Sequence, residues 1–188
     1  MSDRKEPVTD LLERFGRQAD AEGLVDVAWA THDSPIGPLV LAATDHGLVT
    51  VSYRDTAPVL EDLAMRVSPR VLALPSRLDR TRRQLDAYFD GRLQVFDFDL
   101  DLQMMTPFQR TVLAAVREVG FGQVATYQEV ARAIGRPTAS RAAGGANARN
   151  PLPIVVPCHR VVGSNGSLTG YAGGVERKAF LLELERAS

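Results

Sequence analysis

The single cysteine of the chain, Cys158, is followed directly by His159 and Arg160. A thiol reacts as its thiolate, and a neighbouring base or cation lowers its pKa from the free value of about 8.5. The three residues therefore indicate nucleophilic chemistry at sulfur rather than the inert, buried state of an ordinary free cysteine. Adjacent side chains of a strand point to opposite faces. His159 can therefore act on Cys158 only if the backbone turns between them or if a water molecule relays the proton. If neither holds, another residue is the base.

The segment before Cys158 indicates how the thiol is positioned. Residues 154–156 form a short apolar run of Ile and Val, which predicts a buried strand. Pro157 has no N–H to donate to a neighbouring strand, so the strand is expected to end or turn there. The sequence therefore places Cys158 at the end of a buried strand, on a rigid backbone.

Composition excludes several classes of protein. The 188 residues are 45% hydrophobic and 24% charged, which is ordinary for a globular protein. No apolar run approaches the roughly 20 residues of a membrane span, and the polar N-terminus does not resemble a signal peptide. One cysteine allows no intrachain disulfide, which favours a reducing cytoplasm. The three histidines have no cysteine pair beside them, so we expect no structural zinc site.

Charge is distributed unevenly along the chain. Residues 106–188 contain 10 Lys and Arg, nine of them Arg, but only 5 Asp and Glu, whereas residues 1–105 contain 12 basic and 18 acidic residues. Such asymmetry indicates that the basic half meets an anion, although uneven surface charge without function is the alternative. Arg is well suited to phosphate groups and to stacking against bases.

The first half of the chain predicts an α/β domain. A weak helical pattern precedes residue 24, and alternating apolar residues separated by tight turns then predict an antiparallel meander of three strands. The expected domains are an N-terminal tail or helix (1–23), an α/β domain (24–103) and a basic C-terminal domain (104–188). Within the α/β domain we expect strands near 25–29, 39–43, 48–53 and 95–102, with helices near 59–67 and 78–89.

The second half predicts a helix-turn-helix. Thr106 and Thr126 are expected N-caps of helices over 108–119 and 127–134, the latter with a capping box. A third helix over 141–148 follows after a tight turn, as in a helix-turn-helix, although a plain pair of packed helices is the alternative. This third helix is almost all Ala and Gly, so apart from Arg141 near its start it has little with which to read base edges.

Together these residues resemble a known family. Pro157-Cys158-His159-Arg160-Val161-Val162, preceded by Asn150-Pro151 and followed by Gly170-Tyr171 and a late Glu, is similar to the O6-alkylguanine-DNA alkyltransferases, also called methylated-DNA–protein-cysteine methyltransferases. The likeness covers roughly residues 26–187. In the first half it depends only on the motifs at 34–37 and 88–91. It implies a ribonuclease-H-like α/β domain with an antiparallel sheet, then a mainly helical, winged-helix-like domain with a helix-turn-helix.

The resemblance also implies an activity. A member of this family flips a damaged guanine out of duplex DNA and transfers its O6-alkyl group to the cysteine, irreversibly and once per protein molecule. The implied partner is double-stranded DNA containing O6-alkylguanine, bound through the minor groove without sequence readout. The protein is expected to act as a monomer, without cofactor, metal or membrane, and cooperative binding to DNA is left open.

The resemblance assigns roles to individual residues. In the catalytic group, Cys158 is the alkyl acceptor, His159 the base acting through water, Glu185 the carboxylate that orients His159, and Asn150 a brace between the helix-turn-helix and the active-site strand. The remaining residues bind DNA and substrate. Tyr127 contacts the guanine and the rotated phosphate, and Arg141 fills the gap in the base stack. Val161 offers backbone groups to the base edge, Arg160 is a further contact, and the pocket is lined by Pro153, Tyr171, Ala172 and Gly173.

The chain departs from some members of this family. Ala172 stands where some relatives have Ser, so a hydroxyl contact to O6 is lost, although a backbone N–H can serve. The zinc ligands of some N-terminal domains are absent. Two rival functions remain open. One is a lesion-binding protein without transfer activity, which is disfavoured because such relatives have Trp in place of Cys158. The other is a cysteine hydrolase using Cys158, His159 and Glu185, for which no oxyanion donors are evident.

Overall fold

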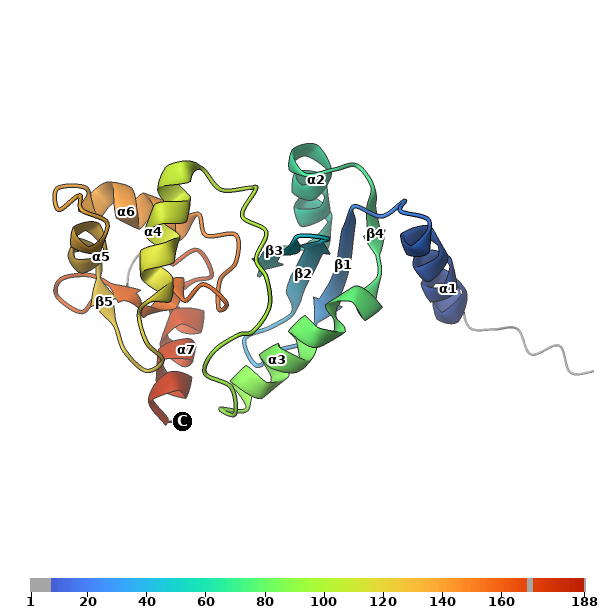
Figure 1. Cartoon of the computed structure of the whole chain (residues 1–188). Helices are drawn as coiled ribbons and strands as arrows, with labels where there is room; N and C mark the ends of the chain where they lie inside the picture. Colours follow the sequence, from blue (N-terminus) through green and yellow to red (C-terminus); the bar gives the residue numbers. More distant parts are fainter. Residues whose placement is uncertain (1–7, 169–170, 188) are drawn as a thin grey trace, which may run out of the picture.

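The computed structural model describes residues 8–168 and 171–187 and consists of two bodies lying side by side (Figure 1). The first body is a sheet flanked by helices, and the second is mainly helical. A helix at the N-terminal end, α1 (Val8–Ala21), lies on the side of the first body remote from the second. The division into an α/β half and a helical half agrees with the predicted fold class. None of the described helices is long and apolar enough to cross a membrane.

The sheet of the first body has the strand order β3-β2-β1-β4. The predicted antiparallel meander is present as β1 (Val27–His32), β2 (Leu39–Thr44) and β3 (Gly47–Ser52). A short strand, β4 (Val71–Ala73), pairs parallel to β1, so the sheet is mixed and the expectation of an antiparallel sheet is corrected. Three residues in a stretch of mixed character are too few for a periodic signal, which explains why β4 was not predicted.

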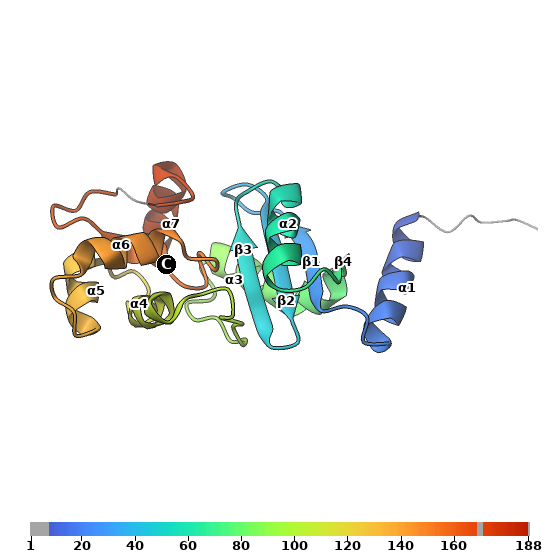
Figure 2. The same ribbon diagram turned by 90° about the horizontal axis from the view of Figure 1, so that it is seen from above.

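Helices cover both faces of this sheet, so its strands are apolar on both sides. α2 (Thr56–Arg66) packs Val59 and Leu63 against one face. On the opposite face lie a 3-10 turn, η1 (Pro75–Leu78), and α3 (Asp79–Phe89), with Leu85 and Tyr88 buried (Figure 2). The predicted helices near 59–67 and 78–89 therefore exist, with slightly different bounds.

The strand predicted over 95–102 is wrong. This segment runs past the edge of the sheet and makes only an isolated parallel bridge between Leu48 and Leu100. The strict alternation correctly predicted which side chains face inward, since Phe96 and Phe98 pack against the core. A ladder does not form along the rest of β3, because the Val51 N–H donates instead to a carbonyl of the second body, that of Pro151, at 2.9 Å.

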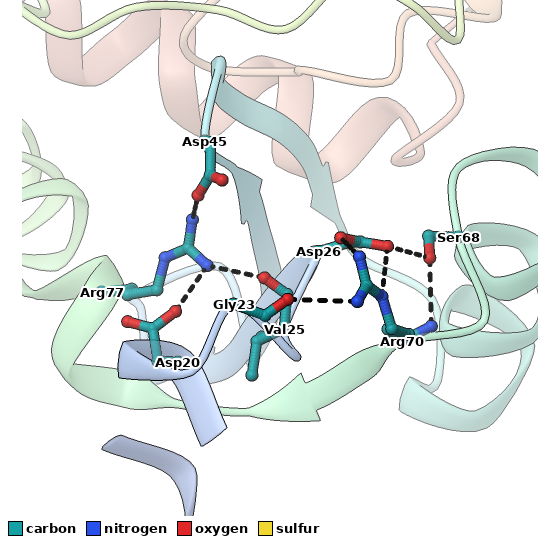
Figure 3. Close-up of polar contacts among 8 residues, drawn as sticks. All are labelled: Asp20, Gly23, Val25, Asp26, Asp45, Ser68, Arg70 and Arg77. Carbon is teal, nitrogen blue, oxygen red and sulfur yellow. Dashed lines mark hydrogen bonds and ion pairs between the residues drawn. The ribbon is translucent and has the colours of Figure 1, made fainter. Parts of the chain in front are cut away.

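α1 is attached to the first body by a small apolar contact and by polar bonds. Ala19 packs with Val25, Ala28 and Leu74. Figure 3 shows Arg77 donating to Asp20 of α1, to the Val25 carbonyl and to Asp45, and Arg70 donating to Asp26 and the Gly23 carbonyl. The helix expected within residues 1–23 is thus present over 8–21, and residues 1–7 lie outside the described residues.

The second body contains α4 (Pro107–Arg117), α5 (Tyr127–Ala133), α6 (Ser140–Ala148) and α7 (Val175–Ala187), with a short parallel pair, β5 (Ala125–Thr126) and β6 (Val161–Val162). Thr106 and Thr126 are N-caps, and each forms a complete capping box with the residue three positions on. α5 and α6 are joined by a tight turn at Gly135, as predicted for the helix-turn-helix.

The strand predicted over 154–156 is also wrong, although all three residues are buried. The Val156 N–H donates to the Leu152 carbonyl at 2.8 Å, and Ile154 has a φ of 73°, so the chain turns here. A single 3-10 turn, η2 (Cys158–Arg160), follows at once. Periodicity cannot separate a buried turn from a buried strand in so short an apolar run.

Candidate active site around Cys158

A cavity of about 310 Å³ lies between the two bodies and reaches Cys158. One wall comes from the end of β3 and from α2, and the other comes from the second body. The predicted lining residues Pro153, Tyr171, Ala172 and Gly173 all face this cavity, as does the predicted brace Asn150. The sequence placed no residue of the first body here, yet Thr50, Val51, Ser52, Tyr53, Arg54, Val59, Asp62, Leu63 and Arg66 also line it.

The η2 turn settles the geometry that the sequence left open. Since the backbone turns between Cys158 and His159, the two side chains need not lie on opposite faces of a strand. Cys158 is only 4% exposed, and burial raises the pKa of its thiol to about 11, against the opposing effects of the Asn150 amide and the Lys178 charge. The sequence predicts a lowered thiol pKa, and this is wrong: desolvation outweighs the nearby donors and cations.

His159 is fully buried and bonded to a carboxylate. Its Nε2 lies 2.8 Å from Oε1 of Glu185, so the two residues that the sequence paired across 26 positions are in contact. Burial lowers the pKa of His159, and the bond to Glu185 offsets this only in part. The neutral ring therefore carries its proton on Nε2, and Nδ1 has no hydrogen-bond partner in the described part of the protein.

Glu185 accepts hydrogen bonds from three parts of the chain besides His159. The Tyr88 hydroxyl of α3 donates to Oε1 at 2.7 Å, the Gly122 N–H donates to Oε2 at 3.2 Å, and Arg160 donates from Nε and Nη2 at 2.8 and 2.9 Å. Burial alone would raise the pKa of this carboxyl, but the bonds from His159 and Arg160 lower it to about 2. Glu185 is therefore an ionised carboxylate that joins the two bodies.

Arg160, which the resemblance gives as a further contact to DNA or substrate, directs its guanidinium into the protein. Besides the two bonds to Glu185, its Nη1 donates to the Val119 carbonyl at 2.6 Å, and its guanidinium lies 5.7 Å from the Phe121 ring centroid. The side chain is almost wholly buried. Its donors are directed into the protein, so in this structure Arg160 orients Glu185 instead of presenting a cation at the surface.

Two asparagines hold the turn that contains Cys158. Asn150 donates to the Val156 carbonyl at 2.8 Å and accepts from the Leu152 N–H at 3.0 Å. Asn147, at the end of α6, donates to the Cys158 carbonyl at 3.2 Å. The sequence analysis includes Asn150 but misses Asn147, whose signal is that it is the one amide in a helix of small residues.

Tyr127 and Arg141 come together on the outer face of the helix-turn-helix. With Gln128, Ser140, Gly144 and Ser164 they line a shallow depression. A Cβ at Gly144 would lie 3.5 Å from the Tyr127 ring, which is an ordinary van der Waals contact, so α6 packs beside this tyrosine. Arg141 is exposed at the start of α6. The predicted finger residues are therefore adjacent in space, on the surface of the second body.

Lys178 is a buried cation that the sequence analysis does not include. It is fully buried, and its Nζ donates to the Val161 carbonyl at 2.5 Å. Burial lowers the pKa of Lys178, and its charge favours the thiolate form of Cys158. The available signal is that Lys178 is the one lysine of the basic half. Within residues 8–168 and 171–187, no three His, Cys, Asp or Glu side chains are grouped so that they could hold a metal ion.

Comparison with known proteins agrees with this architecture. A family model described as the ribonuclease-like domain of 6-O-methylguanine DNA methyltransferase matches residues 27–102, and one described as its DNA-binding domain matches residues 107–187. A methylated-DNA–protein-cysteine methyltransferase of Methanosarcina acetivorans is 45% identical over 84% of this chain and 97% of its own length. The chain belongs to the 6-O-methylguanine DNA methyltransferase family.

Solved structures of this methyltransferase family have the same fold. The Mycobacterium tuberculosis O6-methylguanine methyltransferase matches with a TM-score of 0.76 and 42% identity, covering 86% of this chain and 93% of that one. The same organism's protein in complex with DNA gives a TM-score of 0.75, 42% identity and coverage of 85% and 93%. The resemblance inferred from the motif around Cys158 and the predicted two-domain fold are thus confirmed. Gly170, part of that motif, lies outside the described residues.

Proposed function

We propose that this methyltransferase-family protein repairs DNA directly, by moving the O6-alkyl group of a guanine in duplex DNA to Cys158. The observation that supports this most strongly is the arrangement of Cys158 in an interdomain cavity, directly before a buried His159 paired with Glu185. The helix-turn-helix beside the cavity supplies a surface for DNA. The relatives named above are methyltransferases, and one of them has been crystallised with DNA.

The proton transfer follows from the ionisation states of the site. A thiol with a pKa of about 11 is neutral at physiological pH, so a base must remove its proton during the reaction. Nδ1 of His159 is the acceptor that takes this proton, through a water molecule. Glu185, held ionised by its donors, fixes the ring and stabilises the imidazolium that forms. Lys178 adds a positive charge that favours the developing thiolate.

The chemical step exchanges one bond for another. Sγ of Cys158 forms a bond to the alkyl carbon, the bond from that carbon to guanine O6 breaks, and its electron pair stays on the base, which takes up a proton and leaves as guanine. The product is a thioether, and its bond from sulfur to the alkyl carbon is stable because a thiolate is a poor leaving group. Each protein molecule therefore acts once.

DNA binding is assigned to the outer face of the helix-turn-helix. α6 presents small residues that allow close approach to the minor groove, and exposed Arg141 enters the base stack where the damaged nucleotide leaves. Tyr127 contacts the guanine and the rotated phosphate. Val161 offers backbone groups to the base edge, and Pro153, Tyr171, Ala172 and Gly173 enclose the base and its alkyl group. We assign Arg160 to the orientation of Glu185, in place of contact with DNA.

Intact mass spectrometry tests this proposal. The protein is mixed with duplex DNA containing one O6-methylguanine, and we expect a gain of one methyl group on the peptide containing Cys158, stopping at one equivalent. A Cys158→Ser variant should bind the same DNA without gaining mass. Tight binding by the unaltered protein without any mass gain would instead favour a lesion-binding protein that does not repair.

Arg141→Ala tests the DNA-binding assignment separately. Loss of the finger should weaken duplex binding and slow transfer from duplex DNA by roughly tenfold, the cost of about 1.4 kcal/mol. Transfer from the free alkylated base should hardly change, because no stack has to be opened. Equal slowing on both substrates would contradict the finger role of Arg141.

We also propose a domain division and a location. The chain divides into the N-terminal helix region (1–23), an α/β domain (24–103) and a DNA-binding and alkyl-acceptor domain (104–188). The protein works in the cytoplasm, where DNA is accessible and a lone buried thiol stays reduced. It acts as a monomer.

A further inference from the structure

Tyr53 is a residue of the α/β body that reaches the alkyl-acceptor site. It follows β3 directly and lines the same cavity as Cys158. Its hydroxyl lies 2.6 Å from the hydroxyl of Tyr171, and the two ring centroids are 6.1 Å apart. A side chain 118 positions earlier in the sequence is thus bonded directly to a wall of the pocket. The chemistry proposed above gives Tyr53 no role.

Gly173 packs between the two tyrosine rings. A Cβ placed on Gly173 would lie 2.7 Å from a ring carbon of Tyr53 and 2.7 Å from a ring carbon of Tyr171. No real Cβ comes so close to a ring, so the bare glycine backbone rests on Tyr53. The position of the loop at 171–174 is therefore determined by the Tyr53 ring as well as by its hydroxyl.

Arg177 joins this contact to a second segment of the α/β body. Its guanidinium lies 5.0 Å from the centroid of the Tyr53 ring. Its Nε donates to the Ile36 carbonyl at 2.8 Å, and its Nη1 donates to the Gly173 carbonyl at 2.9 Å. We call Tyr53, Tyr171, Gly173 and Arg177 the Tyr53 cluster. The loop that faces Cys158 is thus held by the end of β3 and by the turn between β1 and β2.

From these contacts we propose that Tyr53 is a positioning residue for alkyl transfer and sets the size of alkyl group that the pocket accepts. The inference rests on the proposed function, because it concerns the substrate of the same site. Tyr53 keeps Tyr171 and Gly173 close to Cys158, which suits a small group such as methyl. Ser52 and Arg54, on either side of Tyr53 in the sequence, and Leu63 of α2 line the same cavity. Removal of the Tyr53 ring enlarges this cavity and relieves the restriction on bulky groups.

The test compares methyl and benzyl transfer in one duplex sequence. Single-turnover rates are measured for the unaltered protein, for Tyr53→Phe and for Tyr53→Ala. Tyr53→Phe removes only the hydroxyl and should slow methyl transfer about 3- to 10-fold, as expected for one lost hydrogen bond in a positioned wall. Tyr53→Ala should slow methyl transfer further and raise the ratio of benzyl to methyl rates at least fivefold. An unchanged ratio in Tyr53→Ala overturns the inference.

Val25→Ala is the matched control. Val25 is buried in the same body and packs with Ala19 of α1 and with Leu74, none of which lines the cavity. Its truncation destabilises the same body without altering the pocket, so both rates should keep their ratio. A change of ratio in Val25→Ala equal to that in Tyr53→Ala would show that general destabilisation is responsible and would overturn the inference.

A double variant tests the bond itself. If Tyr53 acts through Tyr171, the double variant Tyr53→Phe/Tyr171→Phe should transfer methyl at a rate within twofold of the slower single variant. Multiplied effects would overturn the direct coupling. This comparison remains informative if Tyr53→Ala does not fold. If the unaltered protein gains no methyl group, the proposed function is wrong. If it gains a methyl group but Tyr53→Ala leaves the benzyl-to-methyl ratio unchanged, only the inference about Tyr53 is wrong.

Discussion

Arg160 and Arg70 each hold a carboxylate with two nitrogen atoms, but in opposite surroundings. Arg160 donates from Nε and Nη2 to both oxygens of Glu185, whose side chain is 0% exposed. Arg70 donates from Nε and Nη2 to both oxygens of Asp26, and these side chains are 50% and 36% exposed (Figure 3). The bond geometry is nearly the same in the two pairs, one at the joint between the bodies and one at the surface, and they differ in burial.

Burial decides what each pair contributes. At the surface, water solvates either partner alone, so the pair adds little stability. In the interior, each partner depends on the other for its solvation, and loss of one leaves an uncompensated charge. Glu185 also takes bonds from Tyr88 and from His159, so the buried pair connects both bodies with the proposed base.

Glu185→Ala should have the largest effect. It leaves Arg160, His159 and the Tyr88 hydroxyl without their acceptor in the interior, and we expect a loss of about 3–5 kcal/mol in the free energy of unfolding. Urea unfolding followed by circular dichroism measures this. The matched change in the surface pair, Asp26→Ala, should move the urea midpoint only slightly. Equal losses in the two variants would contradict the role of burial.

Tyr88→Phe should have an intermediate effect. It removes one donor to an ionised carboxylate and leaves the aromatic packing in place, so we expect a loss of about 1.5–3 kcal/mol in unfolding free energy. The hydroxyl comes from α3, and the carboxylate comes from α7, so the loss also weakens the joint between the bodies. A variant as stable as the unaltered protein would show that Glu185 does not need this donor.

Acid should weaken the buried site in a defined range of pH. The pKa of Glu185 is lowered from 4.5 to about 2 in the folded protein, so the unfolded state binds more protons than the folded state between these values. The stabilisation from Glu185 is therefore complete above about pH 4.5 and is lost as the pH falls toward 2. Urea unfolding across this range should show a flatter pH dependence for Glu185→Gln than for the unaltered protein. Parallel curves would refute the lowered pKa.

Arg77→Ala should have the smallest effect. Arg77 is 17% exposed, but its carboxylate partners Asp20 and Asp45 are 34% and 81% exposed. Water can solvate these partners when Arg77 is removed, so we expect a loss of about 1 kcal/mol or less in unfolding free energy. Alkyl transfer should stay within twofold, because α1 lies on the side of the first body remote from the second body, to which the η2 turn with Cys158 belongs (Figure 1). Loss of the transfer rate would show that α1 influences the site.

Local chemistry made some features predictable from sequence. Thr126 and Glu129 satisfy the first N–H groups of a helix by themselves, so the sequence specifies where α5 begins. The alternation of residues 95–102 correctly indicated which side chains face the core, because that depends only on side-chain direction. Whether a strand forms there depends on free backbone groups at the edge of β3, and the Val51 N–H of that edge already donates to the Pro151 carbonyl.

Residue types at fixed spacing were enough to predict the proposed nucleophile Cys158, the histidine beside it, the helix-turn-helix and the family. The ionisation of Cys158, the inward direction of Arg160 and the contact of Tyr53 with Tyr171 could be found only in the folded protein. These three features depend on burial and on residues distant in sequence. A pKa or a side-chain direction is set by the surrounding dielectric and donors, which exist only once both bodies have packed together.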